Sequence, residues 1–585
     1  MLDPYRMVFV NVITSLFVLA GTIIYRYVYP KKKINLFILL LIISMLPIIS
    51  IFRTGAYESG DFNIHIYRSM AFFDSLKEGN FMPSWAENLN ATYGYPLFIF
   101  NYSLPYYILS FFHIIGFSFI GSLKIFLGLN LILSGVLMYA MTKELFKNEL
   151  AAFTSAIFYV FAPYHLISTH FKITIGEILA FTLTPVIFIF LNRLLKIKKG
   201  RYINLLMTGF FLGLIALSHI FIAIVLVPIF LAYIIFHLKW GLKSLFYFAS
   251  IFIIGSLISL YQWTPPLIYN KYLFIHLYPI DSAALYYPSI SDLLYSPWRY
   301  GLLFQGPKGE ISSLIGYAQL FIVLSMLLFL LKNKIPKIYK SGVVAWLALI
   351  TVLVLVMIPF SKQLWISLPL ISSAGVHRLL ILVALCSSIL AGYFVLINIK
   401  RKWLILAIVL FAVFTTILNW GQRRVMPQIN DSSLEKNLPY STSQGEAHFY
   451  ANTRWVNPKH PWFSKTPSSH LEILNGKAQV EDLERASTEH KYMITAFSSL
   501  TVKENTLYFP GWSVINNEKP IDIKPDNNGV ITFSLPKGDN KLTLSFDDIY
   551  LFKLSKTISI ASMLIILFIT LIYMVKNYLT FQRHK

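Results

Sequence analysis

The sequence predicts a polytopic α-helical membrane protein with about 13 spans and a small extracytoplasmic β-rich domain before the last span. Of the 585 residues, 56% are hydrophobic and only 13% are charged, whereas soluble globular chains carry about 25% charged residues. Apolar runs long enough to cross a bilayer recur along the chain. The segment 421–555 differs from the rest, because its composition is that of an ordinary soluble domain.

This composition excludes several classes of protein. A chain so apolar is neither a cytosolic enzyme nor a disordered protein. Cys386 is the only cysteine, which excludes a disulfide framework and a cysteine zinc cluster. The formal charge of +23 lies in the hydrophobic part, since residues 1–420 hold 31 basic and 12 acidic residues while 421–555 hold 15 of each. We therefore interpret the charge as the excess of Lys and Arg in cytoplasmic loops, which indicates how the spans are oriented. We expect no nucleic-acid partner.

The apolar runs match the roughly 20 residues that one span needs. The first run is too long for a cleavable signal peptide and lacks a small-residue cleavage site. The predicted spans are 8–28, 34–52, 121–141, 150–167, 175–194, 202–218, 220–238, 244–262, 313–331, 342–360, 378–398, 403–420 and 556–576.

Basic clusters orient these spans, because cytoplasmic loops carry an excess of Lys and Arg. All the clusters, including 31–33 and 400–402, face one side if the apolar stretch 104–120 does not cross. We expect that stretch to form an interfacial or re-entrant helix. The prediction is a multi-pass plasma-membrane protein with its N-terminus outside and its C-terminus in the cytoplasm. Its outer segments are then 53–120, 263–312 and 421–555.

The segment 421–555 alternates in strand fashion in its second half and contains Asn/Asp/Gly turns. This pattern predicts a β-sandwich-like fold over 500–550. The predicted domains are therefore a transmembrane domain at 1–420 with its first outer loop at 53–120, an extracytoplasmic domain at 421–555, and a final span with a cytoplasmic tail at 556–585.

Acidic residues are scarce in the membrane part, so the candidates for chemistry are few. Asp61 follows the second span, and a helix over 61–78 places it on one polar face with His65 and Arg68. That face is suited to line a cavity with an acid, an imidazole and a cation. The alternative is that Asp61 only caps the helix and that Arg68 meets lipid headgroups.

A second cluster lies at the outer ends of the fourth and fifth spans. Glu177 falls two residues inside a predicted span, with His170 and Lys172 just before it. An ionisable group at that depth is costly and is a candidate for function. The alternative is a structural salt bridge between Glu177 and Lys172.

The eleventh span begins with His377 and Arg378 at its outer end. Arginine binds phosphate through two parallel hydrogen bonds, and the phosphate of a lipid carrier lies at about this depth. The alternative is an arginine that extends to the headgroups. No spacing of histidines matches a zinc motif, so no metal ligands are predicted.

Five blocks resemble the GT-C integral-membrane glycosyltransferases, in the branch called 6-pyruvoyl-tetrahydropterin-synthase-related or YfhO-like membrane proteins. The acid Asp61 after a span is followed by a G-x-x-x-P-x-W block at 79–85 and by Gly-Tyr-Pro-Leu-Phe at 94–98. The segment 172–185 is similar to a second family block, which usually has Arg where Lys172 stands. LYFPGWSV at 507–514 is similar to a strand motif of the C-terminal β-domain.

This resemblance implies a GT-C-like fold and a reaction. Such enzymes take a sugar from a polyprenyl-phosphate carrier on the outer face and pass it to a glycan, lipid or protein acceptor, usually with inversion. The role of catalytic base or acceptor-positioning acid carries over to Asp61, and Arg378, Lys172 and Arg68 are candidates to meet the carrier phosphate.

Many family members have two adjacent first-loop acids. Here Phe62 follows Asp61, and Glu177 is the candidate to replace the second acid in space. The missing pair argues against a metal-dependent mechanism, and a divalent metal ion is kept only as an alternative cofactor.

Two other functions stay open at this point. A transporter or flippase of lipid-linked glycans fits the number of spans but predicts two corresponding halves with broken helices, which the sequence does not display. A non-catalytic assembly protein would use the segment 421–555 to bind a glycan or a partner.

Overall fold

The computed structural model describes residues 3–58, 60–197, 200–274, 287–295, 312–367, 375–421, 424–436, 452–460 and 462–583. The chain divides into two compact units. The first unit comprises residues 1–62, 123–255 and 281–428, and the second comprises 63–122, 256–280 and 429–585. The predicted outer segment 263–312 lies partly outside the described residues.

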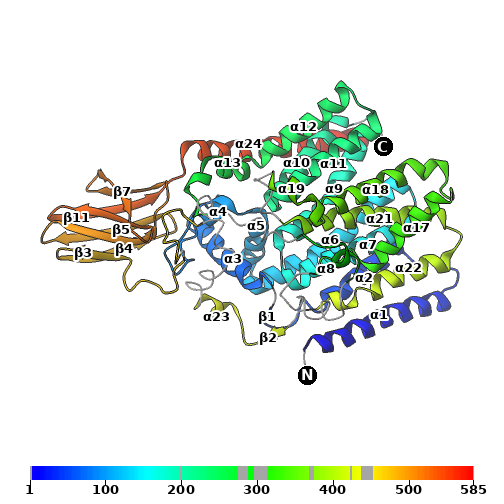
Figure 1. Ribbon diagram of the computed structural model, residues 1–585, viewed down its shortest axis with the longest axis horizontal. Helices are drawn as coiled ribbons and strands as arrows, with labels where there is room; N and C mark the ends of the chain where they lie inside the picture. Colours follow the sequence, from blue (N-terminus) through cyan, green and yellow to red (C-terminus); the bar gives the residue numbers. More distant parts are fainter. Residues whose placement is uncertain are drawn as a thin grey trace. The chain divides into compact units, whose positions relative to one another are not determined.

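The first unit is a helical bundle (Figure 1). Its two short strands β1 (Ala56–Glu58) and β2 (Arg424–Met426) pair in antiparallel fashion, with Ala56 opposite Met426. The helices are α1 (Asp3–Val28), α2 (Leu36–Met45), α6 (Phe119–Phe146), α7 (Glu149–Val160), α8 (Pro163–Ile167), α9 (Ile175–Lys196), α10 (Arg201–Ser218), α11 (Ile220–Leu238), α12 (Leu242–Ile258), α15 (Ile290–Leu294), α17 (Tyr317–Leu331), α18 (Lys337–Leu355), α19 (Lys362–Ile366), α21 (Leu380–Ile397) and α22 (Lys402–Phe414).

Small side chains let these helices approach closely, as is usual in membranes. Gly392 in α21 faces α7, where a Cβ atom would lie 2.6 Å from the Oγ of Ser155 and 2.2 Å from the ring of Phe146. Any larger residue at position 392 would therefore separate α21 from its neighbours. Their close contact buries nearly all of α21.

The prediction of a polytopic membrane protein is confirmed. Within the described residues, 9 helices are long and apolar enough to cross a membrane, or up to 11 if each of two bent pairs is one span. Each bent pair coincides with a predicted span: α7 with the segment Pro163–Lys172, and α12 with α13 (Leu260–Ile268). The predicted spans 34–52 and 313–331 carry shorter apolar helices, Leu36–Ile48 and Tyr317–Leu331. The count of 13 is thus not reached by full-length helices.

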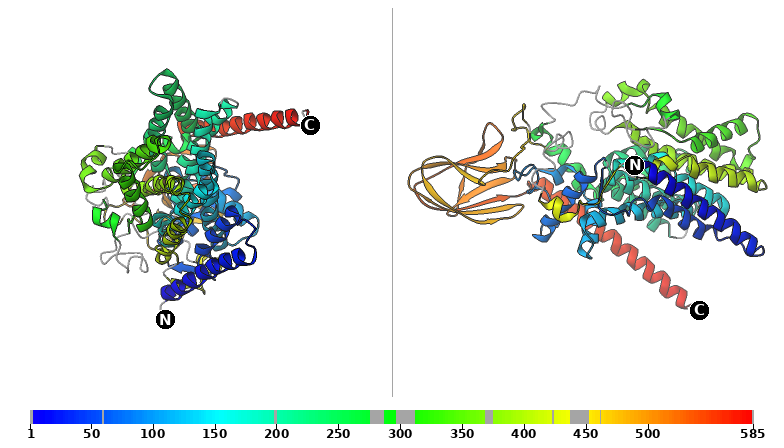
Figure 2. Two further views of the ribbon diagram at one scale, coloured as in Figure 1. Left: turned by 90° about the vertical axis from the view of Figure 1, so that its right-hand side faces the viewer. Right: turned by 90° about the horizontal axis from the view of Figure 1, so that it is seen from below.

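The second unit joins helices of the first outer loop to the β-rich domain. Its helices are α3 (Phe62–Lys77) from its second residue, α4 (Leu97–Phe100), α5 (Leu104–Ile114), α13, α23 (Asp431–Glu435) and α24 (Tyr550–Arg583). At 11 residues, α5 has about half the length of a span. Figure 2 shows α24 as one continuous helix, in red, at the end of the chain.

The β-rich domain holds two antiparallel sheets. One has the strand order β3-β6-β10-β9, and the other has the order β4-β5-β11-β7-β8. The strands are β3 (Leu471–Asn475), β4 (Ala478–Arg485), β5 (Glu489–Ala496), β6 (Leu500–Leu507), β7 (Trp512–Asn516), β8 (Lys519–Ile521), β9 (Lys524–Pro525), β10 (Val530–Leu535) and β11 (Gly538–Phe546). The predicted sheet region 500–550 thus begins earlier, near residue 471.

Three of the family-like blocks meet in one aromatic core of the second unit. The indole of Trp85 lies edge-on to that of Trp512, with ring centroids 5.4 Å apart, and both contact Phe546. Gly94 has a positive φ of 62°, and a Cβ atom there would lie 2.3 Å from Nε1 of Trp85. These blocks therefore attach the segment after the second predicted span to the β-rich domain.

A buried ion cluster lies beside this core. Arg485 donates to Oε1 of Glu504 at 2.6 Å and forms an ion pair with Glu87. Nδ1 of His490 lies 3.0 Å from Oε1 of Glu504, and Trp85 donates to Oε2 of Glu87 at 3.1 Å. Two carboxylates and two cationic side chains thus compensate one another in the interior.

We expect the β-sandwich to lose stability as the pH rises through about 9. Burial alone lowers the pKa of His490, but the carboxylates of Glu87 and Glu504 outweigh burial and raise that pKa to about 9. Because the ordinary value is about 6.5, the stabilisation is fully present below about pH 6.5 and is lost through about pH 9. Hydrogen–deuterium exchange of β5 and β6, corrected for intrinsic rates, measures this loss.

The His490→Gln variant is the control for this titration. Its amide does not ionise in this range, so its exchange protection should stay constant between about pH 6 and about pH 10. Equal pH dependence in the variant and the original protein would contradict the assignment to His490.

Candidate active site

The first unit brings the predicted acid Asp61 to the segment that carries Lys172. The backbone N–H of Asp61 donates to the carbonyl oxygen of Lys172 at 2.7 Å. Gly60 makes this approach possible, because a Cβ atom at that position would lie 2.4 Å from the same carbonyl oxygen. Two sequence blocks more than 100 residues apart therefore meet through their main chains.

The backbone around Lys172 has an unusual conformation. Residues Ser168–Lys172 form a π-helical turn, η2, and Ile173 follows with a left-handed φ of 57°. A β-branched residue at positive φ is strained, and both π-turns and such strain occur mostly at functional sites. The turn ends just before α9, whose first turn carries Glu177.

Glu177 is held at both oxygens. Nε of Arg378 donates to Oε1 at 2.7 Å, and the hydroxyl of Tyr164 donates to Oε2 at 2.6 Å. The Glu177 side chain is 2% exposed and that of Arg378 is 24% exposed. The predicted salt bridge of Glu177 with Lys172 is replaced by this pair with Arg378. Each carboxylate oxygen thus accepts one hydrogen bond, and the contact with Glu177 positions the Arg378 guanidinium.

Lys172 is a buried cation whose ammonium, unlike the Glu177 carboxylate, is not compensated through a hydrogen bond within the described residues. Its residue is 4% exposed, and its ammonium has no hydrogen-bond partner among the described residues. Nζ lies over the ring of Tyr164, 4.6 Å from the centroid. Both Asp61 and Glu177 attract the ammonium electrostatically, while Arg378 repels it. Lys172 therefore points to a place where an anion would gain strong stabilisation.

Two further predicted residues surround this group of charges. The ring of His377 lies 6.3 Å from that of Tyr164. His170 lies on the π-turn, with its Nδ1 3.3 Å from the hydroxyl oxygen of Ser50. The structure thus collects Asp61, His170, Lys172, Glu177, His377 and Arg378 within the first unit.

His65 and Arg68 lie in the second unit, on α3. Both are buried, and Nδ1 of His65 lies 2.9 Å from the hydroxyl oxygen of Tyr106. Tyr106 stacks on Tyr102, with centroids 5.9 Å apart. Burial disfavours the charge of Arg68, but Tyr106 and neighbouring tyrosines outweigh this and raise its pKa. The apolar side chains Ile66 and Met70 of α3 are buried inside the protein.

The donor set does not suit a divalent cation. Within the described ranges, no three His, Cys, Asp or Glu side chains are placed to hold a metal ion. The oxygens of Glu177 already accept from Arg378 and Tyr164. No step is therefore assigned to a metal.

Tyr164 is the site residue that sequence reasoning missed. It bonds to Glu177 and lies beneath Lys172, so it links the two charged groups. A tyrosine at the outer end of a span is common in interfacial belts, and the sequence held no signal that separated Tyr164 from the others.

Searches among known proteins give distant likenesses. The chain is similar to an oligosaccharyltransferase of Archaeoglobus fulgidus tethered with an acceptor peptide, with 13% identity, a TM-score of 0.44, and coverage of 72% of this chain and 60% of that one. It is also similar to the mycobacterial arabinofuranosyltransferase AftD, with 14% identity, a TM-score of 0.41, and coverage of 68% and 27%. For ArnT of Cupriavidus metallidurans bound to undecaprenyl phosphate, identity is 11%, the TM-score is 0.38, and coverage is 69% and 77%.

No sequence-family model matches the chain. An uncharacterized protein of Lactococcus lactis subsp. cremoris strain MG1363 is 24% identical over 212 residues, which are 36% of this chain and 34% of that protein. The chain thus spans about a third of that relative and 60% of the oligosaccharyltransferase.

We expect Glu177→Gln to destabilise the bundle by about 3 kcal/mol, because it leaves the Arg378 guanidinium beside a neutral amide. Tyr164→Phe removes one hydrogen bond and should cost about 1–3 kcal/mol. Thermal unfolding of the purified variants in one detergent measures which of the two substitutions lowers the stability more.

Glu149→Gln is the matched control. Its carboxylate pairs with Lys143 at 2.8 Å, but these side chains are 64% and 48% exposed. Such a solvent-exposed pair contributes little to stability, because water and salt screen it. A loss in Glu177→Gln no larger than in Glu149→Gln would contradict a structural role for the Arg378 pair.

Proposed function

We propose that this protein is a GT-C-type membrane glycosyltransferase. It moves a sugar from a polyprenyl-phosphate-linked donor to an envelope acceptor on the extracytoplasmic face. The observation that carries the proposal is the meeting of Asp61 with the segment of Lys172, joined at 2.7 Å through the main chain. This places a carboxylate near a buried ammonium that lacks a hydrogen-bond partner among the described residues.

Lys172 is proposed to bind the phosphate of the donor. A buried ammonium costs several kcal/mol unless an anion compensates it, and a phosphate supplies that charge. Negative charge grows on the phosphate oxygen as the glycosidic bond breaks, so the ammonium stabilises the transition state more than the ground state. Lys172 is already held over the Tyr164 ring, which reduces the reorganisation needed during the reaction.

Asp61 is proposed as the general base. The acceptor hydroxyl attacks the anomeric carbon, its proton passes to the Asp61 carboxylate, and the bond from that carbon to the carrier phosphate breaks with its electron pair leaving on the phosphate oxygen. Direct displacement of this kind inverts the anomeric configuration.

Arg378 is proposed as a second cation for the phosphate, and Glu177 as its positioning residue. The pair at 2.7 Å uses Nε of Arg378, which is one of the five N–H donors of a guanidinium. His170 and His377 are proposed to border the donor site. His65 and Arg68, which follow Asp61 on α3, are proposed for substrate binding on the basis of the sequence.

The test is the pair Asp61→Asn and Asp74→Asn, each expressed in a strain that lacks the gene. Loss of the general base should lower transfer by about 10²–10⁴-fold, whereas Asp74→Asn keeps an oxygen for the hydrogen bond from Asn88 and should be neutral. Mass spectrometry of envelope glycans and lipids measures the product.

The amounts of both variant proteins in the membrane must match that of the original protein. Full product in the Asp61→Asn strain would overturn the catalytic assignment. If the product is lost in the deletion strain and is fully restored by Asp61→Asn, the protein is needed but its carboxylate is not. A non-catalytic assembly role would explain that result.

A further inference from the structure

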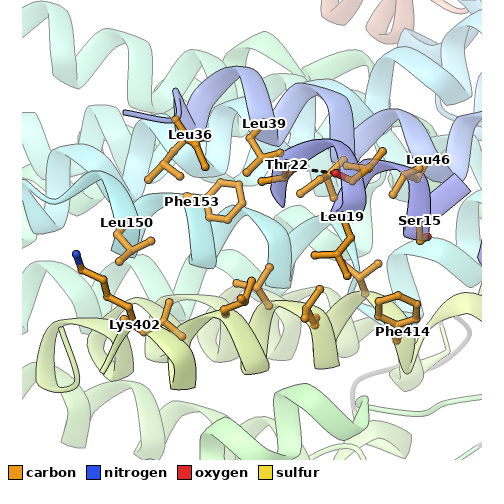
Figure 3. Close-up of a pocket in the computed structure, with 18 residues that line it drawn as sticks. Ser15, Leu19, Thr22, Leu36, Leu39, Leu46, Leu150, Phe153, Lys402 and Phe414 are labelled. Carbon is orange, nitrogen blue, oxygen red and sulfur yellow. Dashed lines mark hydrogen bonds between the residues drawn. The ribbon is translucent and has the colours of Figure 1, made fainter. Parts of the chain in front are cut away.

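An apolar groove runs along the first unit between α1, α2, α7 and α22 (Figure 3). Its volume is about 270 Å³. Two hydroxyl groups line it, and each is satisfied within α1: Ser15 donates to the carbonyl of Asn11 and Thr22 to that of Val18, both at 2.7 Å. The hydroxyl groups of these two residues therefore already donate within α1, and the groove offers mainly apolar surface to a ligand.

The groove has two different ends. Figure 3 shows Lys402 at the end near Leu36 and Leu150, and Ser15 and Phe414 at the opposite end. From Lys402 to Phe414, α22 has 13 residues and so is about 18 Å long. This length is close to the depth of one leaflet, since the hydrocarbon core of a bilayer is about 30 Å thick.

A second trough lies on the other side of the contact between α1 and α2. It has a volume of about 460 Å³ and shares Val18, Thr22, Ile34 and Leu39 with the first. Gly21 widens this trough, because nothing lies within 4 Å of where its Cβ would be. The groove and this second trough are adjacent and share the end at Ile34. Two apolar troughs arranged in this way suit a molecule with two hydrocarbon chains.

That common end is strongly basic. Ile34 and Lys402 line the same groove, and the segments that lead to them carry exposed lysines and arginines with no acid between 26 and 36 or between 398 and 402. Nη1 of Arg26 donates to the carbonyl of Lys32 at 3.0 Å and tethers this loop to α1. Nearby Glu149 is neutralised by Lys143. The basic residues are Arg26, Lys31, Lys32, Lys33, Lys400, Arg401 and Lys402.

We infer that this groove binds an anionic diacyl phospholipid. The acyl chains occupy the two troughs, and the headgroup phosphate meets Lys402 and the 31–33 loop. Clusters of this size beside a membrane helix attract anionic lipids, and basic pockets between helices bind their headgroups. Because the span orientation predicted from the basic loops places this end in the cytoplasm, the site is separate from the outer-face chemistry proposed above and does not depend on it.

Native mass spectrometry of the full chain tests the site with two probes, dioleoyl phosphatidylglycerol and dioleoyl phosphatidylcholine. We expect phosphatidylglycerol to bind at least fivefold more tightly, and Lys402→Gln to remove about fivefold of that preference, the factor that one lysine near the headgroup contributes. Lys337→Gln is the matched control, since Lys337 is also exposed and begins a membrane helix, α18.

A second pair of variants tests the apolar troughs. Leu406 lines the groove and is 39% exposed, whereas Leu327 on α17 is 41% exposed and is not among the groove residues. Leu406→Trp should lower binding of both lipids several-fold, and Leu327→Trp should not.

Equal affinity for the two lipids would overturn the inference, as would equal effects of Lys402→Gln and Lys337→Gln. A second copy of the chain displaced by Leu406→Trp would also overturn it, by showing that a protein occupies the groove. Each variant is first checked by size-exclusion chromatography for a monodisperse elution profile. If Lys402→Gln is misfolded, Lys402→Ala replaces it, and if Leu406→Trp is misfolded, Leu410→Trp replaces it.

Discussion

The cost of placing a charge in an apolar interior governs how this protein arranges its ionisable side chains. An isolated buried ion costs several kcal/mol even after relaxation, so buried charges persist where partners compensate them. Glu177 is held by Arg378 and Tyr164, and Glu504 is held by Arg485 and His490. Lys172 departs from this rule, because its ammonium has no hydrogen-bond partner within the described residues.

The sequence blocks that resemble one family do two different things in the structure. The Trp85, Gly94 and Trp512 blocks build an aromatic core with ring centroids near 5 Å, and they attach the segment after the second predicted span to the β-rich domain. The Asp61 and Lys172 blocks build the charge cluster, where a π-turn and a left-handed Ile173 hold the main chain in a strained form. Similar motifs therefore form an aromatic core in one unit and a cluster of charged side chains in the other.

Two features of the β-rich domain could not be predicted from the sequence: the strand β4 and the partners of Glu504. The edge strand β4 is mostly exposed on both faces, so residues 478–485 lack the alternation that identifies a half-buried strand. Glu504 did carry a signal, because it shares the inward face of β6 with Leu500 and Val502. Its partners Arg485 and His490 lie on other strands, and periodicity does not specify which strands pair.

Hydropathy and the distribution of charge by themselves determined that the chain is a membrane protein, where its apolar helices lie and that a β-rich domain precedes the last one. These properties follow from local composition and from the length that a bilayer imposes. Only the tertiary structure decided that Glu177 pairs with Arg378, 201 residues away, that Tyr164 joins them and that Lys172 stays without a hydrogen-bond partner in the described part of the chain. Those contacts depend on which helices pack together, and a local pattern of 3.6 residues per turn fixes the face of a helix but not its neighbour.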